Sequence, residues 1–289
     1  MRESLQCIGR VAAKGYRFDD TGICIFSYEE MCYYMRNHLI CYLHTLPDRS
    51  LLTFIRDGLR LDKLYRTLYK LEDPARDQMK YFAALFREGN YYSEEEIRGI
   101  LDEYRILKNA PIHQQCKWLG DLFFSSDRAD MACVHYKAAL KQEGLTDTER
   151  GAIHHNYGAA LTRLFRFKDA RIHFLKAYQY ASDEKSLYYY YSIIALNEGL
   201  DKAEEEIRAI GNSDLVLTTF QDDYAQMKVG FQASDYARVF RKMYQLSEGG
   251  REEECNRVYE RFIRGLQKQF RSQIGREDAS YVTSLPVTQ

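Results

Sequence analysis

The chain has 289 residues, of which 45% are apolar and 29% charged, and its formal net charge is −1. That balance is typical of a globular protein and excludes a disordered one. Lysine and arginine are spread along the sequence, which argues against nucleic-acid binding because such binding requires a dense basic surface. Only four prolines occur. Since proline breaks helix interiors, their scarcity favours long helices with short connections.

Cysteine usage and hydrophobic segments indicate the compartment. The seven cysteines include no C-x-x-C pair, so we expect reduced thiols buried as small hydrophobic residues. The first twenty residues contain no sustained apolar stretch, and no signal peptide is predicted. No apolar run approaches the ~18 residues that span a bilayer. We therefore expect a cytoplasmic protein that does not contact a membrane.

The beginning of the chain is predicted to be non-helical. Glycines interrupt residues 1–26, and residues 22–26 form a short β-branched run that favours an extended strand. Ser27 then starts a helix, because a serine followed three residues later by Glu30 is a capping box. We expect that helix to continue to about His44.

Helices without an obvious repeat complete the predicted N-terminal region, residues 1–110. Pro74 is in the favoured position to open one helix. Ser93 and Glu96 form a second capping box, and the helix that they start is predicted to stop before Pro111.

The pattern changes after Pro111. When the sequence is aligned with itself at an offset of 38, small or aromatic residues coincide at four places. A fixed period of this length is typical of helical repeat proteins. The coinciding pairs are Gly120 and Gly158, Ala132 and Ala170, Tyr136 and Phe174, and Ala139 and Ala177.

These positions resemble the tetratricopeptide repeat, a helix–turn–helix unit of about 34 residues. The resemblance implies an all-α solenoid, a right-handed superhelix of helix pairs. Its small residues let two helices approach closely, and its aromatic residues fill the remaining gap. The match is specific over about residues 112–182 and weaker to about 212, and the family's usual proline near the end of each unit is absent. The first unit is carried by Leu119, Gly120, Phe123, Ala132, Tyr136 and Ala139, and the second by Tyr157, Gly158, Leu161, Phe167, Ala170, Phe174 and Ala177.

The solenoid region is predicted to cover residues 111–274, followed by a disordered tail at 275–289. Stacked units cannot bury their apolar faces singly, so each is expected to pack on its neighbours. The stretch Cys24–Tyr34 looks like the N-terminal part of bacterial tetratricopeptide proteins, a likeness that implies no activity. After the second unit, helices are predicted at 186–197, 200–210, 213–229, 234–246 and 251–274.

The resemblance also implies a binding groove, because the first helix of each family unit lines a concave surface that grips a peptide. Some relatives clamp a terminal carboxylate there, and Lys117, Asn156 and Lys185 match three of the five clamp positions. Asp121 and Tyr189 depart from that pattern. An anion ~4 Å from the Asp121 carboxylate would be repelled by about 4 kcal/mol at an effective dielectric constant near 20. A mixed-charge groove for a polar or amphipathic segment is therefore predicted, lined by Lys117, Asp121, His155, Asn156, Ala159, Thr162, Arg163, Lys185 and Tyr189.

A catalytic function is the alternative to binding. The sequence contains no glycine-rich phosphate loop, G-x-S-x-G elbow or H-E-x-x-H pair. His38, Cys41 and His44 have the side chains and spacing of zinc ligands, but they also fit alternating core and surface positions of an aromatic helix. His154 falls at a packing position of the family and His155 on its inner face. No catalytic residue, metal or cofactor is predicted.

Three functions follow as hypotheses. The first is an adaptor that holds another protein or peptide in the groove, with a homodimer left open. The second is a sensor, in which a short peptide shifts the packing of the helices. The third and least favoured is a metal-dependent enzyme centred on His38–His44.

Overall fold

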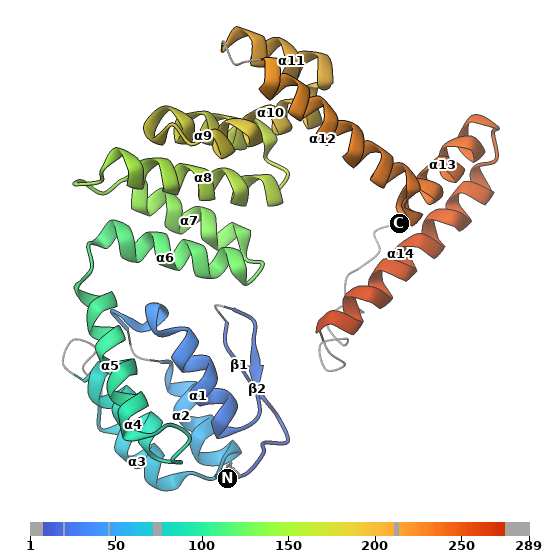
Figure 1. Cartoon of the computed structure of the whole chain (residues 1–289). Helices are drawn as coiled ribbons and strands as arrows, with labels where there is room; N and C mark the ends of the chain where they lie inside the picture. Colours follow the sequence, from blue (N-terminus) through green and yellow to red (C-terminus); the bar gives the residue numbers. More distant parts are fainter. Residues whose placement is uncertain (1–7, 20, 46, 72–76, 211–213, 275–289) are drawn as a thin grey trace, which may run out of the picture. The chain divides into compact units, whose positions relative to one another are not determined.

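The computed structural model describes residues 8–19, 21–45, 47–71, 77–210 and 214–274. The chain divides into two compact units, Met1–Glu206 (unit 1) and Ile207–Gln289 (unit 2). Most of the described residues are helical and very few are in strands, which confirms the all-α prediction. Figure 1 shows the elements in sequence colours.

A small hairpin opens unit 1. Strand β1 (Tyr16–Arg17) pairs antiparallel with β2 (Cys24–Ile25), so the expectation of an extended segment at 22–26 is confirmed over two residues. Ser27 then caps helix α1 (Tyr28–Asn37) through the predicted capping box.

Helix α1 is shorter than predicted, because it ends at Asn37 and not near His44. A 3-10 helix, η1 (Leu39–Tyr42), follows it. The His38 ring causes the break, since its Nδ1 lies 2.7 Å from the Tyr34 carbonyl oxygen, the position that the His38 amide would occupy in a continuing helix. That amide donates to Met35 instead, at 3.3 Å.

Four further helical segments and α5 complete the N-terminal part of unit 1. The expected helix start at Pro74 lies outside the described residues. Ser93 caps α5 through the second predicted capping box, and α5 ends before Pro111 as expected. The segments are α2 (Arg49–Thr53), the π-helical turn η2 (Phe54–Gly58), α3 (Asp62–Tyr69), α4 (Gln78–Arg87) and α5 (Glu94–Asn109).

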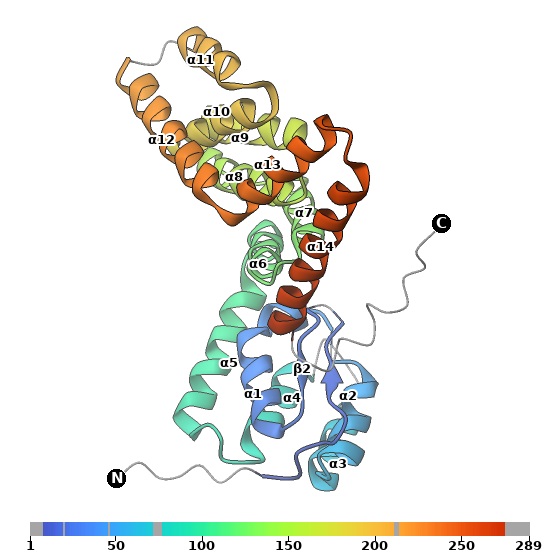
Figure 2. The same cartoon turned by 90° about the vertical axis from the view of Figure 1, so that its right-hand side faces the viewer.

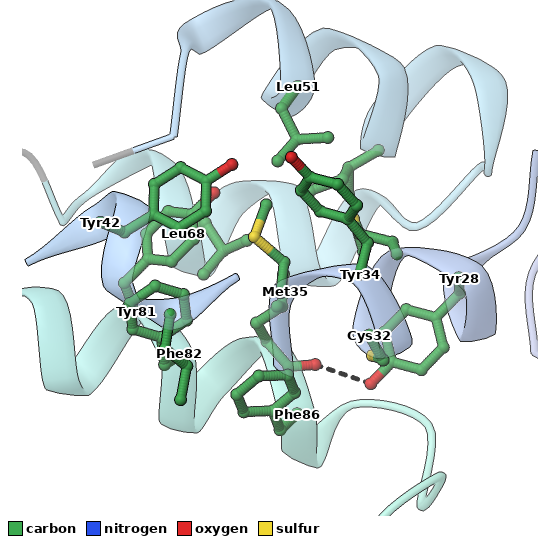
Figure 3. Packing of buried hydrophobic residues seen from close by; sticks show 14 of the residues in the cluster. Tyr28, Cys32, Tyr34, Met35, Tyr42, Leu51, Leu68, Tyr81, Phe82 and Phe86 are labelled. Atoms are coloured by element: carbon green, nitrogen blue, oxygen red, sulfur yellow. Dashed lines mark hydrogen bonds between the residues drawn. The ribbon is translucent and has the colours of Figure 1, made fainter. Parts of the chain in front are cut away.

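Buried tyrosines join these helices in one core (Figure 3). The Tyr28 hydroxyl donates to the Leu85 carbonyl oxygen at 2.6 Å, the dashed line in Figure 3, and accepts from the Gly89 amide at 3.1 Å. The Tyr104 hydroxyl donates to the Tyr42 carbonyl oxygen at 3.2 Å. Because a buried hydroxyl without a partner costs free energy, such bonds let tyrosine stand where phenylalanine would otherwise pack.

Consecutive helices then pack against one another in sequence order, as Figures 1 and 2 show. Contacts join α6 to α7, α7 to α8, α8 to α9 and α9 to α10. The bounds are α6 (Ile112–Ser125), α7 (Ala129–Leu140), α8 (Asp147–Arg163), α9 (Phe167–Ala181), α10 (Glu184–Glu198) and α11 (Leu200–Ala209). The division between the two units falls within α11.

The turns α6–α7 and α8–α9 have the same backbone geometry at the same offset of 38 residues. Asp127 has a φ of 58° and its counterpart Phe165 a φ of 56°. In each turn the amide after this residue donates back across the turn, from Arg128 to Phe123 at 2.8 Å and from Arg166 to Leu161 at 2.9 Å. The period read from side chains therefore extends to the backbone.

Gly120 on α6 and Gly158 on α8 lie directly against aromatic rings. A Cβ atom placed on Gly120 would come within 2.5 Å of Tyr136 Cε1, and one on Gly158 within 3.0 Å of Phe174. Leu119 is partly buried and packs against the N-terminal core. Each of the remaining small positions is fully buried, namely Ala132, Ala139, Ala170 and Ala177.

Unit 2 consists of α12 (Asp214–Ala233), α13 (Asp235–Glu248) and α14 (Glu252–Ile274). Helix α12 continues four residues beyond its predicted end, and Ser234 then caps α13 by accepting from the Ala237 amide. The predicted disordered tail lies outside the described residues. In the described parts of both units, no helix combines the length and the apolar character needed to cross a bilayer.

Candidate functional site

A pocket of about 450 Å³ lies on the α8 and α10 side of unit 1, and we call it the α8–α10 pocket. Six of the predicted groove residues line it, five from α8 and Tyr189 from α10. Those from α8 fall three, four and seven residues apart, the spacing that places side chains on one helix face. The whole lining is Phe124, His155, Asn156, Ala159, Thr162, Arg163, Phe174, Tyr189, Ser192, Ile193 and Leu196.

Sequence reasoning missed the apolar part of this lining. Ser192 and Leu196 follow Tyr189 by three and seven residues, so helical periodicity alone was a sufficient signal for them. Phe174 was assigned only to packing, and it also lines the pocket. Phe124 lies at the end of α6, where the sequence pattern contained no signal for a pocket residue.

Asp121 is the centre of a hydrogen-bond network beside the pocket. Its Oδ1 accepts from the Tyr136 hydroxyl at 2.8 Å and from Asn156 Nδ2 at 2.7 Å. Its Oδ2 accepts from Lys117 Nζ at 2.6 Å. Burial and the bond to Asp121 raise the pKa of Tyr136, so this hydroxyl keeps its proton. Three predicted groove residues therefore interact with one another, and Lys117 and Asp121 do not line the pocket.

Arg163 forms one edge of the pocket. Its guanidinium carbon lies 4.0 Å from the centre of the Phe124 ring, a cation–π contact. Its Nη1 donates to the Phe124 carbonyl oxygen at 2.9 Å and to Asp127 Oδ1 at 2.8 Å. The side chain is held in place by these contacts, and its charge is balanced by Asp127.

His155 lies against the start of α10. Its Nδ1 is 2.7 Å from Ser186 Oγ and 3.4 Å from Asp183 Oδ2. The Ser186 hydroxyl donates to Asp183 Oδ2, so it accepts from His155. Burial lowers the pKa of His155 and outweighs the opposing effect of the nearby Asp183 carboxylate, so the ring is neutral near pH 7.

This group does not have the geometry of a catalytic triad. In a triad the imidazole stands between the carboxylate and the nucleophile and takes the nucleophile's proton. Here the Ser186 proton points to Asp183, and Ser186 is fully buried. The arrangement fixes the α10 N-terminus and activates no nucleophile.

Tyr189 packs its ring into the pocket wall. The ring centre lies 5.5 Å from that of His155 and 5.4 Å from that of Phe174. Lys185 Nζ is 5.8 Å from the Tyr189 ring centre, but Lys185 is exposed and outside the lining. Thr162 donates its hydroxyl proton to the Gly158 carbonyl oxygen at 2.9 Å. No bond to the Tyr189 hydroxyl occurs among the residues described.

The histidines considered as metal ligands have separate partners. His38 stacks on Tyr34 with ring centres 3.9 Å apart, and His44 Nε2 lies 2.9 Å from Gln115 Oε1. In the parts of the chain that the structure describes, no three His, Cys, Asp or Glu side chains gather as a metal site. His154 is buried, and its Nδ1 lies 2.8 Å from that of His173 on α9.

Comparisons with known proteins give no relative from which a function can be transferred. No family model matches the chain, and neither the curated proteins nor the solved structures include a significant match.

Proposed function

We propose that the chain is a tetratricopeptide-type repeat protein that works as an adaptor and binds a segment of another protein in the α8–α10 pocket. The observation that carries this proposal is the convergence of six predicted groove residues on one pocket. Repetition of the inter-helix turn at the offset of 38 supports the repeat assignment.

The lining favours a segment that inserts an apolar side chain. Phe124, Phe174 and Leu196 contribute apolar surface, and Arg163 is the one charged side chain of the lining. Arg163 is balanced by Asp127, and His155 is neutral. An uncharged side chain therefore enters without leaving a buried ion unpaired.

The segment is internal and not a chain terminus. A terminal carboxylate would have to displace Asp121 from Lys117 and Asn156, and those bonds measure 2.6 and 2.7 Å. Displacement would leave the Asp121 carboxylate without these two partners and beside another anion, which costs several kcal/mol.

Filling the pocket tests the proposal. Ala159 lines it and is partly exposed, so Ala159→Phe places a ring in the cavity with the least disturbance of the core. Ala152→Phe is the matched control, since Ala152 is exposed on the same helix and outside the lining. The measurement is capture of partners from the native cell by the tagged full chain, followed by titration of the captured partner against both variants.

We expect Ala159→Phe to weaken binding of the partner at least about tenfold, which corresponds to about 1.4 kcal/mol. Ala152→Phe is expected to bind the partner as the wild type does. Equal binding by both variants at equal helical content, measured by circular dichroism, would remove the pocket as the binding site.

A further inference from the structure

The part of unit 2 whose side chains are described, residues 207–210 and 217–268, contains little buried apolar surface. Its buried hydrophobic side chains are Ile207, Phe220, Ala237 and Leu246. No side chain of α14 from Glu252 to Lys268 is buried. A helix of this kind gains most of its stability from packing and little from propensity. A further surface packed against these helices would therefore add to their stability.

Helix α12 exposes Met227, Val229 and Phe231, and a second exposed apolar side of unit 2 is aromatic. Tyr236, Phe240 and Tyr244 follow one another at four-residue intervals and so share one face of α13, with 45%, 50% and 65% of their surfaces exposed. Tyr259 on α14 is 50% exposed. We call these four residues the aromatic face.

The aromatic face spans two helices that pack against each other. Helices α13 and α14 lie side by side as a hairpin, visible in Figures 1 and 2. The Phe262 ring of α14 contacts Tyr236 and Phe240 edge-on, with ring centres 5.9 and 5.6 Å apart. The exposed rings are thus mounted on a formed hairpin and need no rearrangement to meet a partner.

The size of the aromatic face fits a protein interface. Half of the roughly 200 Å² of an aromatic side chain is about 100 Å², so four rings expose about 400 Å². Since apolar atoms supply about 60% of interface area, this corresponds to about 700 Å² for each partner. Standard interfaces bury about 800 Å² on each side.

A second copy of the chain is the occupant that matches this face. No described helix of unit 1 presents three exposed large apolar residues, so unit 1 offers no stripe of similar kind. Residues 207–289 contain 12 basic and 11 acidic residues, so two copies do not repel each other through net charge. A symmetric pair needs one surface that complements itself, and a straight row of rings satisfies this requirement.

We propose that the aromatic face is the contact surface of a homodimer, in which two α13–α14 hairpins pack face to face as a four-helix bundle. Such a dimer would contain two α8–α10 pockets. The dimer proposal does not depend on what those pockets bind.

Sedimentation velocity of the full chain from about 1 to about 100 µM tests the proposal. The wild type is expected to shift from the monomer mass of 34.1 kDa toward twice that value. Phe240→Glu with Tyr244→Glu is expected to raise the dimer Kd at least thirtyfold, converted from about 2 kcal/mol for a central aromatic contact. The matched control, Ile106→Glu with Val134→Glu, alters two exposed apolar residues of unit 1 and should dimerise normally. A wild type that stays monomeric throughout, or a double variant that dimerises like its control, would overturn the proposal.

Photo-crosslinking separates a second copy from the chain's own unit 1. Replacement of Phe240 by p-benzoylphenylalanine keeps an aromatic ring at the centre of the face, so failure to fold is not expected. Illumination should yield a product of twice the monomer mass, joined between two unit 2 segments. A crosslink within one chain, or the absence of any crosslink, would refute the homodimer. The pocket variant Ala159→Phe should still form the dimer. A failure of the pocket proposal can therefore be told apart from a failure of the dimer proposal.

Discussion

Replacing Gly120 by alanine is expected to destabilise unit 1 although alanine is the better helix former. The added Cβ would lie 2.5, 2.7 and 3.0 Å from three atoms of the Tyr136 ring. Carbon atoms in contact prefer separations of about 3.5 Å or more, so the ring or the helix must move by about 1 Å. Tyr136 is fully buried, and its hydroxyl is bonded to Asp121. The ring therefore has no free space in which to move.

Three contributions set the expected size of the effect. Overpacking of a buried contact costs about 1–3 kcal/mol. Loss of the hydrogen bond from Tyr136 to the Asp121 carboxylate costs about 1.5–3 kcal/mol. The higher helix propensity of alanine relative to glycine offsets about 1 kcal/mol of this loss of stability. We expect a net loss of about 2–4 kcal/mol.

Urea unfolding followed by circular dichroism measures this loss, and two other glycines calibrate it. A Cβ on Gly158 would lie 3.0 Å from Phe174, so Gly158→Ala should cost less, about 1 kcal/mol. A Cβ on Gly99 in α5 would meet nothing within 4 Å, so Gly99→Ala should stabilise by about 0.5–1 kcal/mol. If Gly120→Ala were as stable as Gly99→Ala, the reasoning that these helices pack through a glycine contact would be refuted.

Three further outcomes are expected. Burial is the main cause that lowers the pKa of His154 and of His173 from 6.5 to about 4, so the folded state binds fewer protons than the unfolded chain between these pH values. Stability should therefore fall as the pH drops from 6.5 to 4, and His173→Gln should make that pH dependence shallower; an unchanged slope of urea stability against pH would contradict the assignment. Tyr28→Phe removes a buried hydroxyl that bonds two backbone groups, and it should lower the unfolding free energy by about 1–3 kcal/mol, whereas substitution of the exposed Tyr33 by phenylalanine should not change it measurably. Ser93→Ala removes the cap of α5 and should cost about 1 kcal/mol in the same assay, with threonine at position 93 restoring most of the loss.

Local rules were sufficient for some elements. Ser27 and Ser93 are each followed by a glutamate three residues later, and both capping boxes occur with both of their hydrogen bonds. These signals work from sequence because the bonded atoms lie within one helical turn. The end of α1 was predicted wrongly because it depends on which acceptor the His38 ring takes, and that choice is made by packing.

For the candidate site, the sequence predicted positions but not pairings. The family resemblance placed His155, Asn156 and Arg163 on the groove side of one helix, and they do line one pocket. Asp121 was recognised as unfavourable for an incoming carboxylate. Its role as a shared acceptor for Lys117 and Asn156 was not predicted, since Asn156 is 35 residues away in the chain.

By itself, the sequence determined the helices, most of their boundaries and a period of 38 residues, because these follow from interactions between near neighbours along the chain. Only the tertiary structure decided that Asp121 keeps Lys117 and Asn156 occupied, and that Phe124 and Leu196 make the neighbouring pocket apolar. The physical reason is that a side chain's charge and contacts depend on groups brought close by packing, and packing joins residues that no local pattern connects.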